Sequence, residues 1–330
     1  MLTGAGAGAS RSRPAERLAR GLAPAPVAVV GPTATGKSAL ALELARRRPG
    51  AEIVSVDSMG VYRGMDIGTA KPGPEARGEV PHHLLDLADP SEDFSVQRFQ
   101  AAGGVALTGI SARGGVAVLA GGTGLYLRSV VDGLDLPGRW PELAASLSEE
   151  ADAGGGSGLA GLHRRLAGLD PVAAGRILPT NRRRLVRALE VTLGSGRPFS
   201  SYGPGLTSYP ATPVRMVALA LARPVLDARI GERVAAQMEA GWLAEAAGLT
   251  ARPGGLSRTA GQALGYRELW RHVEGELSLE AAVAETVSRT RRLARRQEAW
   301  FRRDPRIVWV DAGGPPEKVV ARVAEVLGDW

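Results

Sequence analysis

Cysteine is absent from this chain of 330 residues, which excludes a disulfide framework and a zinc site built from thiolates. Long apolar runs are absent too. None reaches the roughly 18 residues that a helix needs to cross a bilayer, so no membrane span is expected. Residues 1–25 are rich in Gly, Ala, Arg and Pro. They lack the apolar segment of a secretory signal, so we expect a disordered leader and a cytoplasmic protein.

Lysine is almost absent. Only Lys37, Lys71 and Lys318 occur, although the formal net charge is +7, because arginine supplies the other positive charges. A basic balance suggests a polyanionic partner, with a compositional drift toward arginine as the alternative. An ammonium group and a guanidinium group bind phosphate differently, so the positions of these few lysines are informative.

Lys37 lies in the sequence Gly-Pro-Thr-Ala-Thr-Gly-Lys-Ser at 31–38, which fits the phosphate-binding pattern G-x-x-x-x-G-K-[ST]. An apolar run at 27–30 predicts a strand before it, and a helical period at 39–47 predicts a helix after it. That order points backbone N–H groups and a helix N-terminus at one anion. Lys37 would add a charge and Ser38 a hydroxyl ligand for Mg²⁺. The alternative is a chance turn in a glycine-rich chain. The predicted phosphate ligands are Gly31, Pro32, Thr33, Ala34, Thr35, Gly36, Lys37 and Ser38.

Strands and helices alternate on both sides of a less regular central stretch. Further buried strands are predicted at 51–56, 115–120, 214–221 and 306–310, and helices at 95–111, 224–247, 259–274 and 277–303. This alternation indicates a parallel α/β sheet. The stretch between the two parts is Gly/Ala-rich, with helical patterns at 159–169 and 182–193. We therefore expect an α/β fold with a three-layer core of the P-loop type, residues 26–133 and 206–330, interrupted by a mainly helical insertion domain, residues 134–205.

The acidic residue that a nucleotide-hydrolysing P-loop protein needs is missing after the strand at 115–120, which ends in Gly-Gly-Thr-Gly. The strand at 51–56 does end in an acid, Asp57. Ligands of parallel sheets lie at the carboxyl ends of the strands, so Asp57 is expected near the phosphate loop. It could bind Mg²⁺ or act as a general base. The alternative is a turn or N-cap aspartate.

Arginines cluster in two helical segments, at 182–187 and 289–303. In the second, at about 100° per residue, all seven arginines fall in one arc, opposite Val287, Leu293, Ala294, Trp300 and Phe301. This pattern favours a surface that contacts a phosphate backbone. The alternative is a solvated charged face, although Glu298 is the only acid in the segment. For the adjacent His82 and His83 a structural role is expected, because their spacing suggests no metal site.

These motifs together resemble the tRNA dimethylallyltransferase family, also called tRNA isopentenyltransferases. The most specific is Tyr-Arg-Gly-Met-Asp-Ile-Gly-Thr-Ala-Lys at 62–71. Further matches are Asp57-Ser58, Pro-His-His-Leu-Leu-Asp at 81–86, Gly-Gly-Thr-Gly-Leu-Tyr at 121–126, Arg-Leu-Val-Arg-Ala-Leu-Glu at 184–190, Gln-Ala-Leu-Gly-Tyr-Arg-Glu at 262–268 and Thr-Arg-Arg-Leu-Ala-Arg-Arg-Gln at 290–297. The similarity extends from about residue 26 to residue 311.

The resemblance implies a reaction. The dimethylallyl group of dimethylallyl diphosphate moves to the exocyclic amine of the adenosine that lies 3′ of the anticodon, in tRNAs reading codons that begin with U. Diphosphate leaves. The phosphate loop with Mg²⁺ would stabilise the leaving diphosphate, and Asp57 would accept a proton from the weakly nucleophilic amine. The partners implied are the tRNA anticodon stem-loop and dimethylallyl diphosphate.

The resemblance also implies roles for individual residues. Asp57, Thr33 and Arg233 would be catalytic, with Thr33 and Arg233 on the diphosphate. The insertion domain would contact tRNA. The residues implied in tRNA binding are Asp57, Ser58, Met59, Gly60, Thr123, Arg183, Arg184, Leu185, Val186, Arg187, Gln262, Ala263, Leu264, Gly265, Tyr266, Arg267, Arg292, Arg295 and Arg296.

Three positions depart from the family pattern. Many members have Gln where Gly60 stands, an arginine near the position of Ala144, and an asparagine where Thr180 precedes Asn181. These departures concern tRNA contacts and leave the chemistry in place. The alternatives to this function are an ATP-dependent small-molecule phosphotransferase of the P-loop class and a non-catalytic RNA-binding protein. Nothing in the sequence suggests an obligate oligomer, so a monomer is expected.

Overall fold

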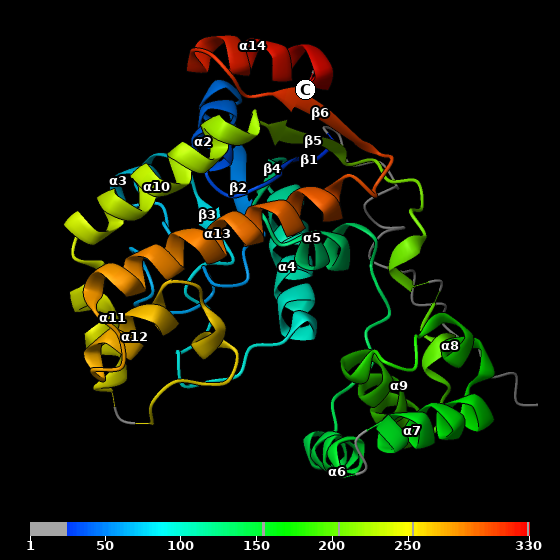
Figure 1. Cartoon of the computed structure of the whole chain (residues 1–330). Helices are drawn as coiled ribbons and strands as arrows, with labels where there is room; N and C mark the ends of the chain where they lie inside the picture. Colours follow the sequence, from blue (N-terminus) through cyan, green and yellow to red (C-terminus); the bar gives the residue numbers. More distant parts are fainter. Residues whose placement is uncertain (1–24, 154–155, 204, 253, 329) are drawn as a thin grey trace, which may run out of the picture. The chain divides into compact units, whose positions relative to one another are not determined.

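The computed structural model describes residues 25–153, 156–203, 205–252, 254–328 and 330. The expected leader therefore lies outside the described residues, except for Ala25. Within them the chain forms a six-stranded parallel sheet with the order β3-β2-β4-β1-β5-β6 (Figure 1). The strands are β1 Val27–Val30, β2 Ala51–Ser55, β3 His82–His83, β4 Val116–Ala120, β5 Arg215–Ala220 and β6 Ile307–Asp311.

Alternate side chains of each strand face the two sides of this sheet, as the pleat requires. Val27 and Val29 of β1 pack with α2 (Lys37–Arg47) and α14 (Pro316–Leu327) on one side. Ala28 and Val30 belong to the larger core on the other side. That core includes α4 (Val96–Ala112), which begins at Ser95 as expected because the Ser95 hydroxyl accepts from the Arg98 N–H, and α5 (Gly124–Val131). The result is the expected α/β fold of three layers.

The helices after β5 differ from the expected segments. The single helix predicted at 224–247 is two helices, α10 (Arg223–Glu239) and α11 (Trp242–Thr250), because Gly241 takes a left-handed conformation with φ 96° and ends the run. The helix predicted at 259–274 is a 3₁₀ turn, η3 (Ala260–Gln262), followed by α12 (Tyr266–Val273). The long helix α13 (Leu279–Phe301) follows the prediction closely.

The chain divides into two compact units, residues 1–133 with 210–330, and residues 134–209. The end of the insertion, expected at residue 205, thus falls after Tyr209. The second unit is helical and has its own apolar core, which includes Leu147, Leu162 and Leu185. Its elements are α6 Pro141–Asp152, α7 Gly156–Leu169, α8 Pro171–Arg176, α9 Arg182–Ser195, η1 Phe199–Ser201 and η2 Gly205–Thr207. Helix α6 lies in a stretch for which no helix was predicted.

The two segments of the first unit that flank the insertion are held together by one side chain, that of Arg306. The guanidinium of Arg306 binds Asp132 Oδ1 at 2.7 Å and donates to the Pro210 carbonyl at 2.7 Å. The side chain of Asp132 is 1% exposed and also binds Arg128 at 2.5 Å. Among the described residues, no helix is long and apolar enough to cross a membrane.

Candidate active site

The loop between β1 and α2 has the geometry of an anion-binding turn. Gly31 has φ 124°, and a Cβ there would lie 2.8 Å from the Leu219 carbonyl oxygen on the neighbouring strand. Gly36 has φ 92° and leads directly into the first turn of α2. Thr35 is buried and its hydroxyl donates to the Pro32 carbonyl at 2.9 Å. The glycines at both ends are thus required by close packing or by backbone conformation.

Lys37 lies buried at the start of α2, and its ammonium donates to the Pro32 carbonyl at 2.6 Å. Burial, followed by repulsion from Arg233, lowers the pKa of Lys37 to about 7, and Asp57 partly offsets this. An anion in the loop would favour the protonated form of Lys37, because its negative charge would attract the ammonium group. Ser38 is exposed beside Lys37, so its hydroxyl is open to a ligand.

Thr33 is held from two helices that follow β5. The guanidinium of Arg233, on α10, donates to Thr33 Oγ1 at 3.0 Å. The Thr33 N–H donates to Gln297 Oε1, on α13, at 2.8 Å. Burial lowers the pKa of Arg233, and the nearby carboxylate of Asp57 partly counters it. The structure thus brings together Thr33 and Arg233, which lie 200 residues apart in the sequence.

Asp57 follows β2 at the carboxyl edge of the sheet. Its Oδ1 accepts hydrogen bonds from the N–H groups of Met59 at 2.8 Å and Gly60 at 3.3 Å. Asp57 therefore does stabilise a turn, which was the alternative to a catalytic role. It also acts electrostatically on Lys37 and Arg233. One oxygen of the Asp57 carboxylate thus orders the loop, while the negative charge of the carboxylate interacts with Lys37 and Arg233. The next residue, Ser58, donates its N–H to Thr123 Oγ1 at 3.1 Å, which brings the ends of β2 and β4 together.

The long loop after Asp57 is fixed by side chains of α10, α11 and α12. The carboxylate of Glu245 accepts from the N–H groups of residues 66, 67 and 68. Tyr266 donates its hydroxyl to Glu245 and accepts from the Gly68 N–H at 3.2 Å. Gln237 donates to the Ile67 carbonyl at 2.6 Å. Burial raises the pKa of Tyr266, with Glu245 adding to the effect, so this phenol stays neutral.

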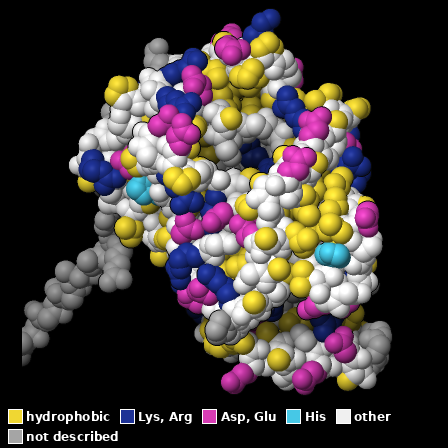
Figure 2. Space-filling model, turned by 90° about the vertical axis from the view of Figure 1, so that its left-hand side faces the viewer, with side chains coloured by type: hydrophobic (Ala, Val, Ile, Leu, Met, Phe, Trp, Pro, Cys, Tyr) yellow, Lys and Arg dark blue, Asp and Glu magenta, His cyan; other side chains and the backbone are white. Residues whose placement is uncertain are grey.

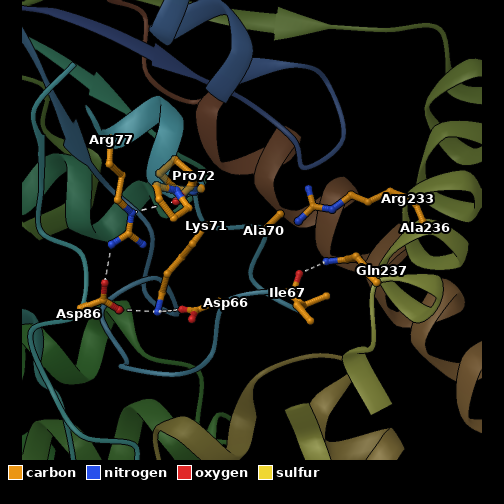
Figure 3. Close-up of a pocket in the computed structure, with 13 residues that line it drawn as sticks. Asp66, Ile67, Ala70, Lys71, Pro72, Arg77, Asp86, Arg233, Ala236 and Gln237 are labelled. Atoms are coloured by element: carbon orange, nitrogen blue, oxygen red, sulfur yellow. Dashed lines mark hydrogen bonds and ion pairs between the residues drawn. The ribbon is translucent and has the colours of Figure 1, made fainter. Parts of the chain in front are cut away.

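A pocket of about 630 Å³ opens between this loop and α10, with Arg233 and Gln237 on one side and Lys71 and Arg77 on the other (Figure 3). Lys71 binds Asp66 and Asp86, each at 2.7 Å, and Arg77 binds Asp86 at 2.8 Å. These cations are therefore neutralised by their neighbours. Arg233, which reaches Thr33, connects the pocket to the phosphate loop.

The arginines of the segment 289–303, at and just beyond the C-terminal part of α13, fall into two groups. Arg289 binds Glu268 and Glu285, Arg291 lies near Asp227, and Arg302 binds Glu298. Two of these acids, Glu268 and Asp227, come from α12 and α10, and Glu285 precedes the arginine segment on α13, so only Glu298 could be counted within the segment 289–303 itself. Among the described residues, Arg292, Arg295, Arg296 and Arg303 are exposed without an acidic partner within 4.0 Å. On the face drawn in Figure 2, by contrast, many basic and acidic side chains lie side by side.

Comparison with known proteins decides the family. The family model described as IPP transferase matches residues 60–304. The tRNA dimethylallyltransferase of Streptomyces coelicolor is 47% identical over 302 residues, which cover 92% of this chain and 95% of that protein. The chain belongs to the IPP transferase family. The resemblance seen in the motifs is confirmed.

Other relatives of this IPP transferase agree. The tRNA dimethylallyltransferase of Streptomyces avermitilis is 48% identical over 92% of this chain and 96% of that protein. The crystal structure of the full-length tRNA isopentenylpyrophosphate transferase from Bacillus halodurans is similar with a TM-score of 0.66 and 37% identity. The match covers 91% of this chain and 94% of that one. The similar structures confirm the α/β fold of the P-loop type.

The residues that the family resemblance implied in RNA binding differ in exposure in this IPP transferase. Gln262 and Arg267 are exposed, whereas Ala263, Gly265 and Tyr266 are buried. A Cβ on Gly265 would lie 2.0 Å from the Trp242 ring, so this turn is a packing element. Leu264 is half-buried, as are Ser58, Met59 and Thr123, while Gly60 is buried.

In the second unit of the IPP transferase, Arg183 and Arg184 are exposed on α9, while Leu185 and Val186 lie in its core. Arg187 binds Glu190 at 2.8 Å and donates to the carbonyls of Pro137 and Gly138. The side chains available to a ligand in this segment are therefore those of Arg183 and Arg184.

His82 and His83, for which a structural role was predicted, both contact nearby groups of the same chain. His83 Nε2 lies 2.6 Å from Glu52, and His82 Nδ1 lies 2.7 Å from the Val80 carbonyl. Within the described part of the chain, no three His, Asp or Glu residues form a group that could hold a metal ion.

Gln297 and Glu245 are site residues that the sequence analysis missed. Gln297 had a usable signal, because at about 100° per residue it falls in the middle of the apolar arc of α13, where a polar side chain needs a partner. Glu245 had none, since its partners are backbone groups of a distant loop.

Proposed function

We propose that this IPP transferase moves the dimethylallyl group of dimethylallyl diphosphate to the exocyclic amine of an adenosine in tRNA. The target is the adenosine 3′ of the anticodon, in tRNAs reading codons that begin with U. The arrangement of Thr33, Lys37 and Arg233 around one loop, within the electrostatic reach of Asp57, carries the proposal. The cations suit a diphosphate, and the carboxylate suits a proton acceptor.

In the proposed reaction, the amine nitrogen attacks C1 of the dimethylallyl group as the bond from C1 to the diphosphate oxygen breaks. The leaving diphosphate takes the bonding electrons, and the loop and Arg233 stabilise the charge that develops on it. Asp57 accepts the proton that the amine loses. The base must leave its stack in the RNA to reach a site at the sheet edge.

Mg²⁺ is proposed as the cofactor. The donors suit it, because this ion usually takes one or two protein oxygens together with phosphate oxygens and water. Ser38 would supply a hydroxyl, as predicted from the sequence, and the diphosphate would supply the other charged ligands. The ion would neutralise charge on the leaving group.

The test of this function is transfer of label from dimethylallyl diphosphate to an anticodon stem-loop, followed by mass spectrometry of the nucleosides. We expect one dimethylallyl group on the adenosine and release of diphosphate. Hydrolysis of ATP without any transfer would instead support the phosphotransferase alternative. That alternative leaves unexplained why β4 is followed by Gly121, Gly122 and Thr123 and not by an acid.

The same proposal takes the enzyme to be cytoplasmic. It also takes the enzyme to be a monomer, because the loop, Arg233 and Asp57 all come from one unit of one chain. Light scattering on the purified protein at working concentration would reveal a dimer if the proposal were wrong.

The unpaired arginines of α13 are proposed to bind phosphates of the tRNA. Changing Arg295 and Arg296 together to alanine should weaken tRNA binding by about tenfold and lower the slope of log K against log salt by about 1.5. The kcat at saturating RNA should stay near that of the wild type. Titration of a labelled stem-loop at several salt concentrations measures this.

The matched control changes Arg46 and Arg47 to alanine. These adjacent arginines of α2 have side chains that are 46% and 56% exposed, and they pair with Glu43 of the same helix and with Glu79 of α3 (Pro74–Glu79). They should leave the salt slope unchanged. Equal effects from the two double variants would mean that net charge, rather than the α13 surface, governs binding.

A further inference from the structure

Gln297 links two turns that belong to the proposed active site. Its Oε1 accepts from the Thr33 N–H at 2.8 Å, and its Nε2 donates to the Gly122 carbonyl at 3.1 Å. Thr33 follows β1 and Gly122 follows β4, and these strands are neighbours in the sheet. One amide from α13 therefore bridges the carboxyl ends of two strands.

Helix α13 lies directly against these turns. A Cβ on Gly122 would lie 2.3 Å from Gln297 Nε2, and one on Gly124 would lie 2.0 Å from Trp300 Nε1. Glycine is thus required at both positions for the helix to approach. The exposed Arg295 and Arg296 precede Gln297 on the same helix. Helix α13 therefore carries the proposed RNA-binding arginines and also contacts the phosphate loop.

A side-chain amide provides both contacts without ionisation at any working pH, since it carries a carbonyl acceptor and an N–H₂ donor. The Thr33 N–H is used by Gln297, so it cannot also face the diphosphate. What remains for the diphosphate at this position is the Thr33 hydroxyl, which Arg233 also contacts.

We propose that Gln297 is a positioning residue for the prenyl transfer. It fixes Thr33, and through it Arg233, at the place where the leaving diphosphate gathers charge, and it holds the α13 helix against the phosphate loop. This inference rests on the proposed function. A misplacement of about 1 Å at such a site can lower the rate about 100-fold. We expect ground-state binding of the RNA to stay unchanged.

The first test is Gln297→Met, which keeps the volume and length of the side chain and removes both hydrogen bonds. We expect kcat to fall about 10- to 100-fold and KM for the RNA to stay within about twofold. A kcat within about twofold of wild type would overturn the proposal. So would a fall in kcat matched by loss of RNA binding or of the folded state in circular dichroism.

The second test is Gln297→Glu, which gives a readout that a purely structural role would not move. The ionised carboxylate can accept from the Thr33 N–H but cannot donate to the Gly122 carbonyl, and it adds negative charge beside the diphosphate. The protonated acid can make both bonds. The ratio of its kcat to that of wild type should therefore rise as the pH falls from 8.5 to 5.5, by up to about tenfold per unit until the introduced carboxyl is protonated.

The ratio for Gln297→Met should not vary with pH over the same range. Ionisable groups that all three proteins share contribute equally to each and cancel in the ratios. A pH-independent ratio for Gln297→Glu would overturn the proposal.

Failure of the proposed function itself would look different, because the wild type would then transfer no dimethylallyl group. Calorimetry with Mg²⁺ and inorganic diphosphate would still decide the role of Gln297. Binding about fivefold weaker in Gln297→Met would support it, and equal binding would overturn it.

Discussion

Changing Asp57 to asparagine should lower the rate of dimethylallyl transfer by about 100- to 10,000-fold, the range that general bases contribute. Asparagine keeps an oxygen that can accept from the N–H groups of Met59 and Gly60, so the turn that Asp57 orders is retained. What it removes is the ability to take the proton of the amine. The measurement is single-turnover transfer to a stem-loop with both substrates saturating.

Asp57→Ala is the companion variant, because it removes the base and the turn contacts together. The rate of dimethylallyl transfer should fall by the same factor in both variants. Only the alanine variant should also bind RNA more weakly. If the asparagine variant keeps more than about a tenth of wild-type turnover, the proton goes elsewhere and Asp57 only shapes the loop.

Changing Lys37 to methionine should lower kcat about 100- to 1,000-fold, as expected for a donor aimed at developing negative charge in a site screened from water. Methionine fills most of the same volume, so the loop should keep its fold. Thermal unfolding provides the check, since an unchanged midpoint would attribute the loss to charge.

Diphosphate binding by the wild type should also depend on pH in a direction set by Lys37. Its pKa is lowered to about 7 in the free protein, chiefly by burial, so above pH 7 the ammonium is mostly neutral and must take up a proton when the anion binds. Affinity should therefore fall as the pH rises above 7, by up to about tenfold per unit.

Calorimetry at pH 8 in two buffers of different ionisation enthalpy should show proton uptake by the wild type that Lys37→Met lacks. The ionisation of diphosphate itself contributes equally to both proteins. Equal uptake by both would mean that Lys37 is already charged in the free enzyme.

The local signals in the sequence predicted much of the core. The strand at 27–30, the phosphate loop and the helix after it share one short stretch, so the pattern and the fold coincide there. The placement of Asp57 at the carboxyl edge followed from the geometry of parallel strands. Helix α14 was not predicted. The break at Gly241 was missed because an isolated glycine within a helical period is tolerated as often as it ends a helix.

The contacts of the site were harder to predict because they join distant segments. The acids that pair with Arg289 and Arg291 lie on α10 and α12 as well as on α13, so counting charges within α13 overstated its free positive charge. Arg295 and Arg296 remained unpaired for reasons of helix packing that the sequence of α13 alone does not contain. Gln297 carried the one local signal that was overlooked.

The contacts of Arg306 have a consequence for how the insertion is accommodated. Because one guanidinium holds both Asp132 and the Pro210 carbonyl, the two ends of the insertion start side by side. For the first unit, the insertion is therefore equivalent to a short loop between two neighbouring residues, whatever the length of the insertion. Each doubling of a flexible connection at such a point costs only about 0.6 kcal/mol of closure entropy. The helices of the insertion can thus be lengthened, shortened or exchanged without repacking the sheet that carries the loop at 31–38.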